Sequence, residues 1–441
     1  AEDGDVVLIS PDTYIEDLLI PPKSITLQSF GDVNFEVVGD FDFDVTYTDN
    51  ADDNTANSGL HTIVVKGLTL TGDIDDTTSS GNYNYNISYH GSFIDAVFDN
   101  VDMNIPNHSF DFYYCDLNVA SFIIGHCNYF IGNNIINGNI NFYNYSNLVF
   151  EGGSNLKTEI IANHFSATGS LEIQDQNECF QGDNASNETV SADLCSAREF
   201  VIANNYFLKA IPIRVYGYSK AVLKVLNNTF NPPTNTYSHG MIMAISNTPL
   251  IVFDNNIFWS TALTSNSGIS LFNFFSGTSD LMYMRNNAFN NIPTYQSPDI
   301  NTTSTCSYTS GGYSSAIFSR NQDAECVNTI ISENNIMLTG YEGSSVISDY
   351  ANNLGVVNDA NVLNILQDTG LDDIDYRDID NTINDPGPGG GPYSVYNYFD
   401  ANGSNNLSKA RIISLDIPTT IYGLPGLSGY QVNSKAIISK E

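Results

Sequence analysis

Short apolar runs, each broken by a turn-forming dipeptide, follow one another along most of the chain. A typical unit places alternating apolar residues before an Asn-Asn pair and an apolar residue after it, as in 203–207 and 254–258. Alternation with a period of two is typical of β-strands, and Asn tolerates the left-handed backbone of a tight corner. The pattern therefore predicts short strands joined by corners, and an all-β fold.

The unit recurs at the spacing expected of a solenoid coil. Its closing apolar residues stand at positions 70, 103, 136, 165, 207, 230, 258, 289 and 337. The two longest intervals, 165 to 207 and 289 to 337, each enclose a pair of cysteines. A repeat of this length predicts a solenoid of roughly nine to twelve coils, in which each coil buries its core only against its neighbours. The long intervals are interpreted as loop insertions tied by disulfides.

The first coil carries a family resemblance. The run from Gly4 through Pro11-Asp12-Thr13-Tyr14 leads into Lys23-Ser24-Ile25-Thr26-Leu27. It resembles the opening of right-handed parallel β-helix proteins of the pectin-lyase-like superfamily, with Asp12 where Gly is customary. The resemblance covers residues 4 to 350 and implies a right-handed parallel β-helix. It implies no particular activity, because that superfamily includes lyases, hydrolases, tailspikes and adhesins.

The charge balance excludes some partners. Fifty acidic residues face 15 basic ones, which gives a formal net charge of -35. Such a surface repels nucleic acid and anionic lipid, so we expect no nucleic-acid partner and no membrane insertion. It attracts cations, and plain solubility is the alternative explanation for the charge.

Six cysteines fall in three close pairs, Cys115/Cys127, Cys179/Cys195 and Cys306/Cys326. None has zinc-site spacing, so three disulfides with sequential pairing are predicted, although connectivity stays open. Disulfides indicate a secreted protein, either extracellular or at the cell surface. Nine N-glycosylation sequons, about as many as chance supplies, stand at Asn86, Asn107, Asn144, Asn184, Asn187, Asn227, Asn301, Asn402 and Asn406.

Two acidic runs are candidate Ca²⁺ sites. Their carboxylates are Asp49, Asp52, Asp53, Asp73, Asp75 and Asp76. Alternating carboxylates in loops are common Ca²⁺ ligands, but neither run has the EF-hand pattern, so solvated loops are the alternative. No cofactor is expected to be required.

The coil pattern fades near residue 350. We expect residues 1–385 to form the β-helix, the Pro/Gly run 386–392 to be a linker, and residues 393–441 to be an extended β-like tail. The tail has two interpretations. It caps an open end of its own solenoid, or it adds strands to a neighbouring subunit.

No set of lyase or polygalacturonase motifs is recognisable. Ser238-His239-Gly240 resembles one polygalacturonase element but lacks the accompanying Asp-Asp and Arg-Ile-Lys runs. The balance is against an enzyme. We expect an extracellular structural or surface protein, a glycosylated subunit of a filament or appendage that associates with itself or with other extracellular proteins. The alternatives are a polysaccharide-processing hydrolase or lyase and a glycan-binding adhesin, for which tyrosines such as Tyr113 and Tyr114 offer sugar-stacking rings.

Overall fold

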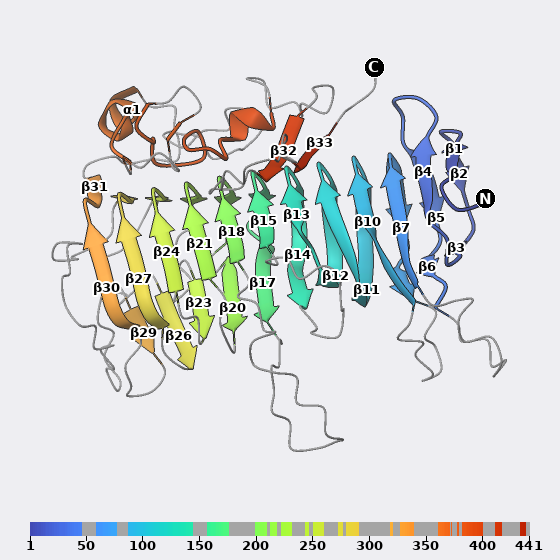
Figure 1. The fold of residues 1–441 in the computed structure, drawn as a ribbon, viewed down its shortest axis with the longest axis horizontal. Coiled ribbons are helices and arrows are strands. Elements are labelled where there is room, and N and C mark those ends of the chain that lie inside the picture. The colour runs from blue at the N-terminus through green and yellow to red at the C-terminus, as the bar shows by residue number, and fades with distance from the viewer. Residues whose placement is uncertain are drawn as a thin grey trace, which may run out of the picture.

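A computed structural model describes most of the predicted coils. The described residues are 1–45, 59–76, 87–143, 157–175, 199–209, 212–217, 222–231, 243–246, 250–259, 272–276, 279–290, 318–320, 327–338, 360–370, 372, 377–378, 382–399, 411–416 and 433–437. Within them, strands β1 to β31 form one continuous parallel network (Figure 1). No described helix is long and apolar enough to cross a membrane.

The strands stack in three columns, and each strand pairs with the one a full coil later. One position in the first column is filled by the C-terminal end of a long strand, β11 (Val97–Tyr113). Its other strands are β1 (Val6–Ile9), β4 (Ile25–Ser29), β7 (Gly59–Lys66), β10 (Ile87–Ile94), β13 (Tyr129–Ile131), β15 (Lys157–Ile161), β18 (Glu199–Ala203), β21 (Val222–Leu226), β24 (Leu250–Asp254), β27 (Ser279–Arg285) and β30 (Val327–Glu333).

The second and third columns share three long strands that bend around a corner, namely β11, β12 (Asp116–His126) and β14 (Asn134–Tyr143). The second column further contains β2 (Thr13–Tyr14), β5 (Phe35–Val38), β8 (Leu68–Thr71), β16 (His164–Phe165), β19 (Tyr206–Phe207), β22 (Thr229–Phe230), β25 (Ile257–Trp259), β28 (Ala288–Asn290) and β31 (Ile336–Leu338). The third further contains β3 (Leu18–Ile20), β6 (Phe41–Phe43), β9 (Ile74–Asp76), β17 (Gly169–Asp175), β20 (Ile213–Gly217), β23 (Met243–Ser246), β26 (Phe272–Ser276) and β29 (Phe318–Arg320).

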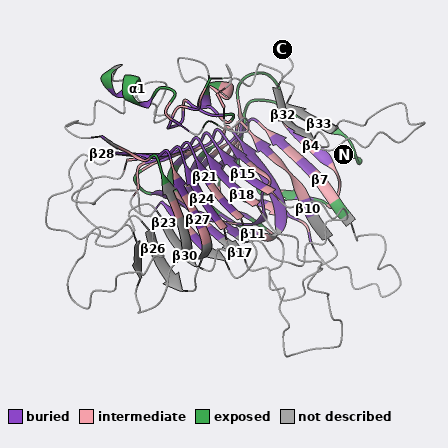
Figure 2. Cartoon of the chain, turned by 60° about the vertical axis from the view of Figure 1, so that its left-hand side comes forward, coloured by how far each residue is buried: buried purple, intermediate pink, exposed green. Residues whose placement is uncertain are grey.

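The described strands β1 to β31 thus form one long parallel sheet, compatible with a solenoid, and the prediction of a mostly β fold is confirmed. Inward side chains of all three columns form one core that runs the length of the coils (Figure 2). Aromatic rings stack from coil to coil, and the Phe207 and Phe230 centroids are 5.1 Å apart with nearly parallel rings. Since each ring covers the one before it, burial propagates along the axis and no coil is independent of its neighbours.

The chain does not stop at the last coil but returns along the outside of the solenoid. After α1 (Ala360–Leu366), residues 382–399, which we call the strap, lie along the corner between the first and second columns (Figure 1). The strap ends in the short 3-10 helix η2 (Val395–Asn397). Beyond it, β32 (Arg411–Asp416) and β33 (Asn433–Ile437) form a separate antiparallel pair.

The Pro/Gly run 386–392, expected as a linker, is therefore part of this packed strap. Most of it is buried, and its carbonyls accept hydrogen bonds from coil asparagines. Glycine is needed here for close contact, because a Cβ on Gly390 would lie 2.0 Å from the Asp385 carbonyl oxygen.

Candidate functional site

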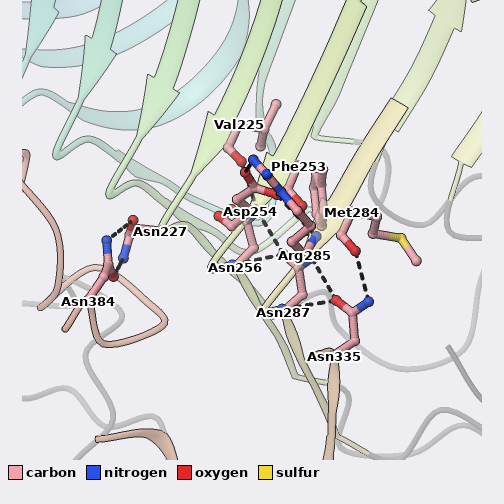
Figure 3. A network of polar contacts seen from close by, with 10 residues as sticks. All are labelled: Val225, Asn227, Phe253, Asp254, Asn256, Met284, Arg285, Asn287, Asn335 and Asn384. Carbon is pink, nitrogen blue, oxygen red and sulfur yellow. Dashed lines mark hydrogen bonds and ion pairs between the residues drawn. The ribbon is translucent and has the colours of Figure 1, made fainter. Parts of the chain in front are cut away.

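The two asparagines have opposite roles in the pairs 204/205, 227/228, 255/256, 286/287 and 334/335, whereas at 133/134 the corner residue is Gly132 and Asn133 points inward. The first adopts a left-handed backbone, as at Asn227 (φ 53°) and Asn255 (φ 58°), and turns the chain from the first column into the second. The second, as at Asn228 and Asn256, points into the solenoid and is buried. Figure 3 shows this divergence: Asn227 faces Asn384 of the strap, whereas Asn256, Asn287 and Asn335 face one another.

The inward asparagines form a continuous ladder. Each ladder asparagine donates two hydrogen bonds to the side-chain Oδ1 of the next one. The backbone N–H donates at 2.8–3.0 Å, and the side-chain Nδ2 donates at 2.9–3.1 Å. Its members are Asn133, Asn163, Asn205, Asn228, Asn256, Asn287 and Asn335. Such polar groups are tolerated in a core only when their hydrogen bonds are made, so the ladder fixes the register between coils.

The outward asparagines bind the strap. Asn204 donates from Nδ2 to the carbonyls of Pro388 and Gly390 at 2.8 and 2.7 Å. One coil further on, Asn227 donates to Asn384 Oδ1 at 2.7 Å and to the Asp385 carbonyl at 2.8 Å. This row therefore recognises the backbone of the chain's own returning segment.

Apolar contacts extend the strap toward the N-terminal coils. Outward residues at the end of the first column, among them Tyr113, Ile131 and Ile161, pack with Val395 and Phe399. The Phe399 and Tyr114 ring centroids are 5.8 Å apart in an edge arrangement. Tyr113 is 4% exposed. These two tyrosines are covered by the strap, so they are not the exposed sugar-stacking rings considered from the sequence.

A buried ion pair lies at the other end of the same row. Arg285 Nη2 is 2.6 Å from Asp254 Oδ2, and Asp254 has no exposed surface (Figure 3). The Arg285 backbone N–H and Nε also donate to Asp254 Oδ1 at 3.1 and 3.2 Å. Burial raises the pKa of Asp254 above its ordinary value even though Arg285 acts to lower it. The arginine thus keeps a desolvated carboxylate paired.

A second group of titratable residues lies where the strap crosses the first column. Lys157 Nζ is 2.5 Å from Glu159 Oε1 and 3.4 Å from Tyr393 Oη of the strap. Burial acts to lower the pKa of Lys157, but Tyr393 and Glu159 outweigh it and the pKa ends above its ordinary value. Two coils earlier, Asp111 accepts the Asn128 and Tyr129 backbone N–H groups, both at 2.9 Å. These charges are satisfied by structural partners.

Aspartates form a short column of their own at the corner leading into the third column. Asp17 Oδ1 accepts the Asp40 N–H at 3.0 Å, Asp40 Oδ1 accepts the Asp73 N–H at 3.0 Å, and Asp73 Oδ1 accepts the Asp102 N–H at 3.1 Å. Asp75 pairs in register with Asp42 of the preceding coil. Burial, then the Asp76, Asp73 and Asp40 charges, raise the pKa of Asp75.

Asp75→Asn is expected to stabilise the fold at pH 7 and to change nothing at pH 3. Because folding raises the pKa of Asp75, the folded state binds this proton more tightly than the unfolded state does. The ionised carboxyl therefore lowers stability at neutral pH, and that loss disappears as pH falls below its unfolded pKa. The side chain is exposed, so the gain should stay under about 1 kcal/mol. Urea unfolding at both pH values measures it, with the exposed Asp32→Asn as control. Equal gains at pH 3 and pH 7 would contradict this explanation.

The candidate Ca²⁺ ligands are only partly brought together. Asp73 accepts the Asp102 N–H in the aspartate column described above, and Asp75 is exposed. Asp76 Oδ2 lies 3.8 Å from His108 Nε2 in a buried pair. No metal-binding group of three or more side chains occurs in the described part of the chain. Asp49, Asp52 and Asp53 lie outside the described residues, so a Ca²⁺ site that includes them stays a prediction.

The predicted Cys115–Cys127 disulfide is wrong, because both side chains are thiols. Phe112 of one coil pairs with Phe130 of the next. Cys115 follows Phe112 by three residues, beyond the corner at Tyr114, while Cys127 precedes Phe130 by three, so the two cysteines are offset from each other between neighbouring coils. Burial raises the pKa of Cys115 to about 12. Cys179, Cys195, Cys306 and Cys326 lie outside the described residues.

One sequon is incompatible with a glycan in this fold. Asn227 is 1% exposed, and its Nδ2 is occupied by the strap. Asn107 lies within β11. The other seven fall outside the described residues, at Asn86, Asn144, Asn184, Asn187, Asn301, Asn402 and Asn406.

Comparisons with known proteins give the chain no relative. No protein-family model, no curated protein and no solved structure matches it. Any function must therefore be inferred from the coils themselves.

The strap contacts are the feature that the sequence interpretation missed. The sequence did contain a signal for them. Corners that need a left-handed residue carry Asn instead of Gly at 204, 227, 255 and 286. Unlike glycine, asparagine has a side-chain amide that can form further hydrogen bonds at such a corner. What that amide would bind could not be read from the pattern.

Proposed function

We propose that this chain is an extracellular structural or surface protein built on a right-handed parallel β-helix of the pectin-lyase-like type. The observation that carries the proposal is the combination of the asparagine ladder with the strap. The ladder links successive coils by hydrogen bonds inside the solenoid. The strap contacts the outside of the coils from Tyr114 to Asn227. Such double cross-linking resists bending and local opening of the coils, which suits a rigid spacer.

The surface charge supports an extracellular setting. A net charge of -35 keeps such a rod soluble and separate from nucleic acid and from anionic lipid. The buried charged residues described above, Asp111, Glu159 and Asp254, are held by structural hydrogen bonds or ion pairs. They therefore support a scaffold better than they support catalysis.

Two measurements test the proposal together. Antibodies against the purified protein should label intact, unpermeabilised source cells, and a panel of neutral and acidic polysaccharides should yield no reducing ends and no unsaturated products. Negative-stain microscopy then distinguishes single rods from filaments. Turnover of a polysaccharide that is lost in Asp111→Asn or Glu159→Gln would replace the scaffold with an enzyme. Labelling only after permeabilisation would overturn the extracellular assignment.

A further inference from the structure

A half-buried lysine beside the third column reaches across two coils. Lys209 directly follows the coil segment that contains β19, and its Nζ donates to Ser170 Oγ at 3.0 Å and to the Thr168 carbonyl at 3.2 Å. Ser170 and Thr168 belong to the preceding coil. Lys209 Nζ also lies 3.4 Å from Oδ1 of Asn139, which is on β14, one coil further back. The three side chains of Asn139, Ser170 and Lys209 therefore meet from three successive coils.

The surroundings of Lys209 favour the uncharged amine. All three of its acceptors are neutral oxygens, and no carboxylate among the described residues lies within ion-pair distance of it. Lys224, by contrast, pairs with Glu199 at 2.9 Å. Burial and then the nearby charge of Arg214 lower the pKa of Lys209. A lysine that loses its proton in a desolvated place becomes a nucleophile.

Ser170 polarises the amide that faces this amine. Its hydroxyl donates to Asn139 Oδ1, and its oxygen accepts from Lys209 Nζ. Ser170 is 4% exposed and is in register with Asn139 in the parallel ladder, so the sheet fixes their relative positions. A hydrogen bond to a carbonyl oxygen stabilises the negative charge that forms there when a nucleophile adds to the carbon.

The amine is close to the carbon that it would attack. Because a carbonyl bond is about 1.2 Å long, Asn139 Cγ lies no more than about 4.6 Å from Lys209 Nζ. Addition needs a separation of about 3–3.5 Å, and the flexible four-carbon stem of lysine can close the difference. Both groups belong to one folded chain, so their reaction needs no encounter between two molecules.

We propose that Lys209 and Asn139 join through an isopeptide bond that forms spontaneously in the folded chain. The Nζ electron pair forms a bond to Asn139 Cγ, while Ser170 takes a proton from Nζ and passes its own hydroxyl proton to Oδ1. That proton moves to Nδ2 as the Cγ–Nδ2 bond breaks, and ammonia leaves. No oxidant, cofactor or second protein takes part.

The bond ties three coils covalently next to the asparagine ladder. It closes a loop from residue 139 to residue 209 and restricts the unfolded chain in the way that a disulfide does. It therefore protects the coils on either side of the long interval from 165 to 207. This inference does not depend on the proposed function.

Peptide mapping of the purified chain, unfolded and digested with chymotrypsin, tests the bond by mass spectrometry. Most molecules should yield one branched peptide that contains both Asn139 and Lys209, at the summed mass of the two peptides less one ammonia. Recovery of the two peptides separately, with the Asn139 amide intact, would overturn the proposal.

A second source of ammonia loss lies close by and needs its own outcome. Asn137 precedes Gly138, a dipeptide that readily closes to a succinimide with loss of ammonia. A succinimide at Asn137 leaves the peptide of Lys209 separate. Ammonia loss confined to the peptide of Asn137 and Asn139 therefore counts against the isopeptide bond.

Three variants assign the reacting groups. Lys209→Arg keeps the positive charge but removes the primary amine, so it should abolish the branched peptide, whereas Lys224→Arg should leave it in place. Ser170→Ala should slow its appearance by at least about tenfold in chain sampled at intervals after cell-free synthesis. Buried-type fluorescence of Trp259 verifies that each variant folds. A branched peptide that persists in Lys209→Arg contradicts the assignment of Lys209, and an unchanged rate in Ser170→Ala contradicts that of Ser170.

Discussion

Asn228→Ala is expected to lower the free energy of unfolding of the ladder coils by about 3 to 5 kcal/mol. Asn228 Oδ1 accepts the Asn205 backbone N–H at 2.9 Å and Asn205 Nδ2 at 3.0 Å, and its own Nδ2 donates to the Ile202 carbonyl at 2.8 Å. Alanine leaves these buried groups without partners, and each unsatisfied group costs about 1–3 kcal/mol. Because Asn228 is fully buried, water cannot replace the lost bonds.

Urea unfolding followed by the fluorescence of Trp259 measures this effect. Trp259 is the chain's one tryptophan, is fully buried, and lies on β25, the strand that pairs with β22 directly after Asn228. Asn104→Ala removes an exposed asparagine from a strand of the same solenoid and should change stability by less than about 0.5 kcal/mol. A similar loss in the two variants would mean that the ladder adds nothing beyond an ordinary surface asparagine.

Arg285→Ala is expected to destabilise the same region by about 3 kcal/mol at pH 7. The change leaves the Asp254 carboxylate fully buried without its cation, and breaking a buried pair from one side costs about 3–5 kcal/mol. We place the loss at the lower end because the backbone N–H of residue 285 still donates to Asp254 Oδ1.

The pH dependence of this variant has a definite sign. The pKa of Asp254 is already raised by burial, and loss of Arg285 raises it further. An acid whose folded pKa lies above its unfolded pKa lowers stability when ionised, so the loss should be full at pH 7 and shrink toward pH 4.

Two companion variants identify the cause. Arg285→Ala combined with Asp254→Asn should recover most of the loss, since no buried charge remains. Arg377→Ala, which breaks the exposed pair with Asp372, should cost less than about 1 kcal/mol. A loss in Arg285→Ala that is the same at pH 4 and pH 7 would assign the effect to lost packing over Tyr283, whose ring lies 4.6 Å from the guanidinium carbon.

The sequence determined the solenoid itself. Period-two alternation with a turn former at each corner leaves the chain one economical way to bury its apolar residues, which is to stack coils in parallel. The recurring Asn-Asn pairs located the corners correctly, because a corner needs a residue that tolerates the left-handed backbone.

Tertiary structure alone decided what surrounds the coils. Cysteine spacing suggested a bond between Cys115 and Cys127, but the register between two coils separates them, and register is a property of pairing that local sequence does not contain. In the same way, the sequence assigned the Asn-Asn pairs to corners and indicated no partner for the side chain of Asn227 or Asn204. The Asn227 amide binds a strap from 160 residues or so further along the chain, at Gly387. The hydrophobic periodicity of the sequence indicates which residues face the core. Contacts between distant segments depend instead on the path that the chain takes along the solenoid after the last coil.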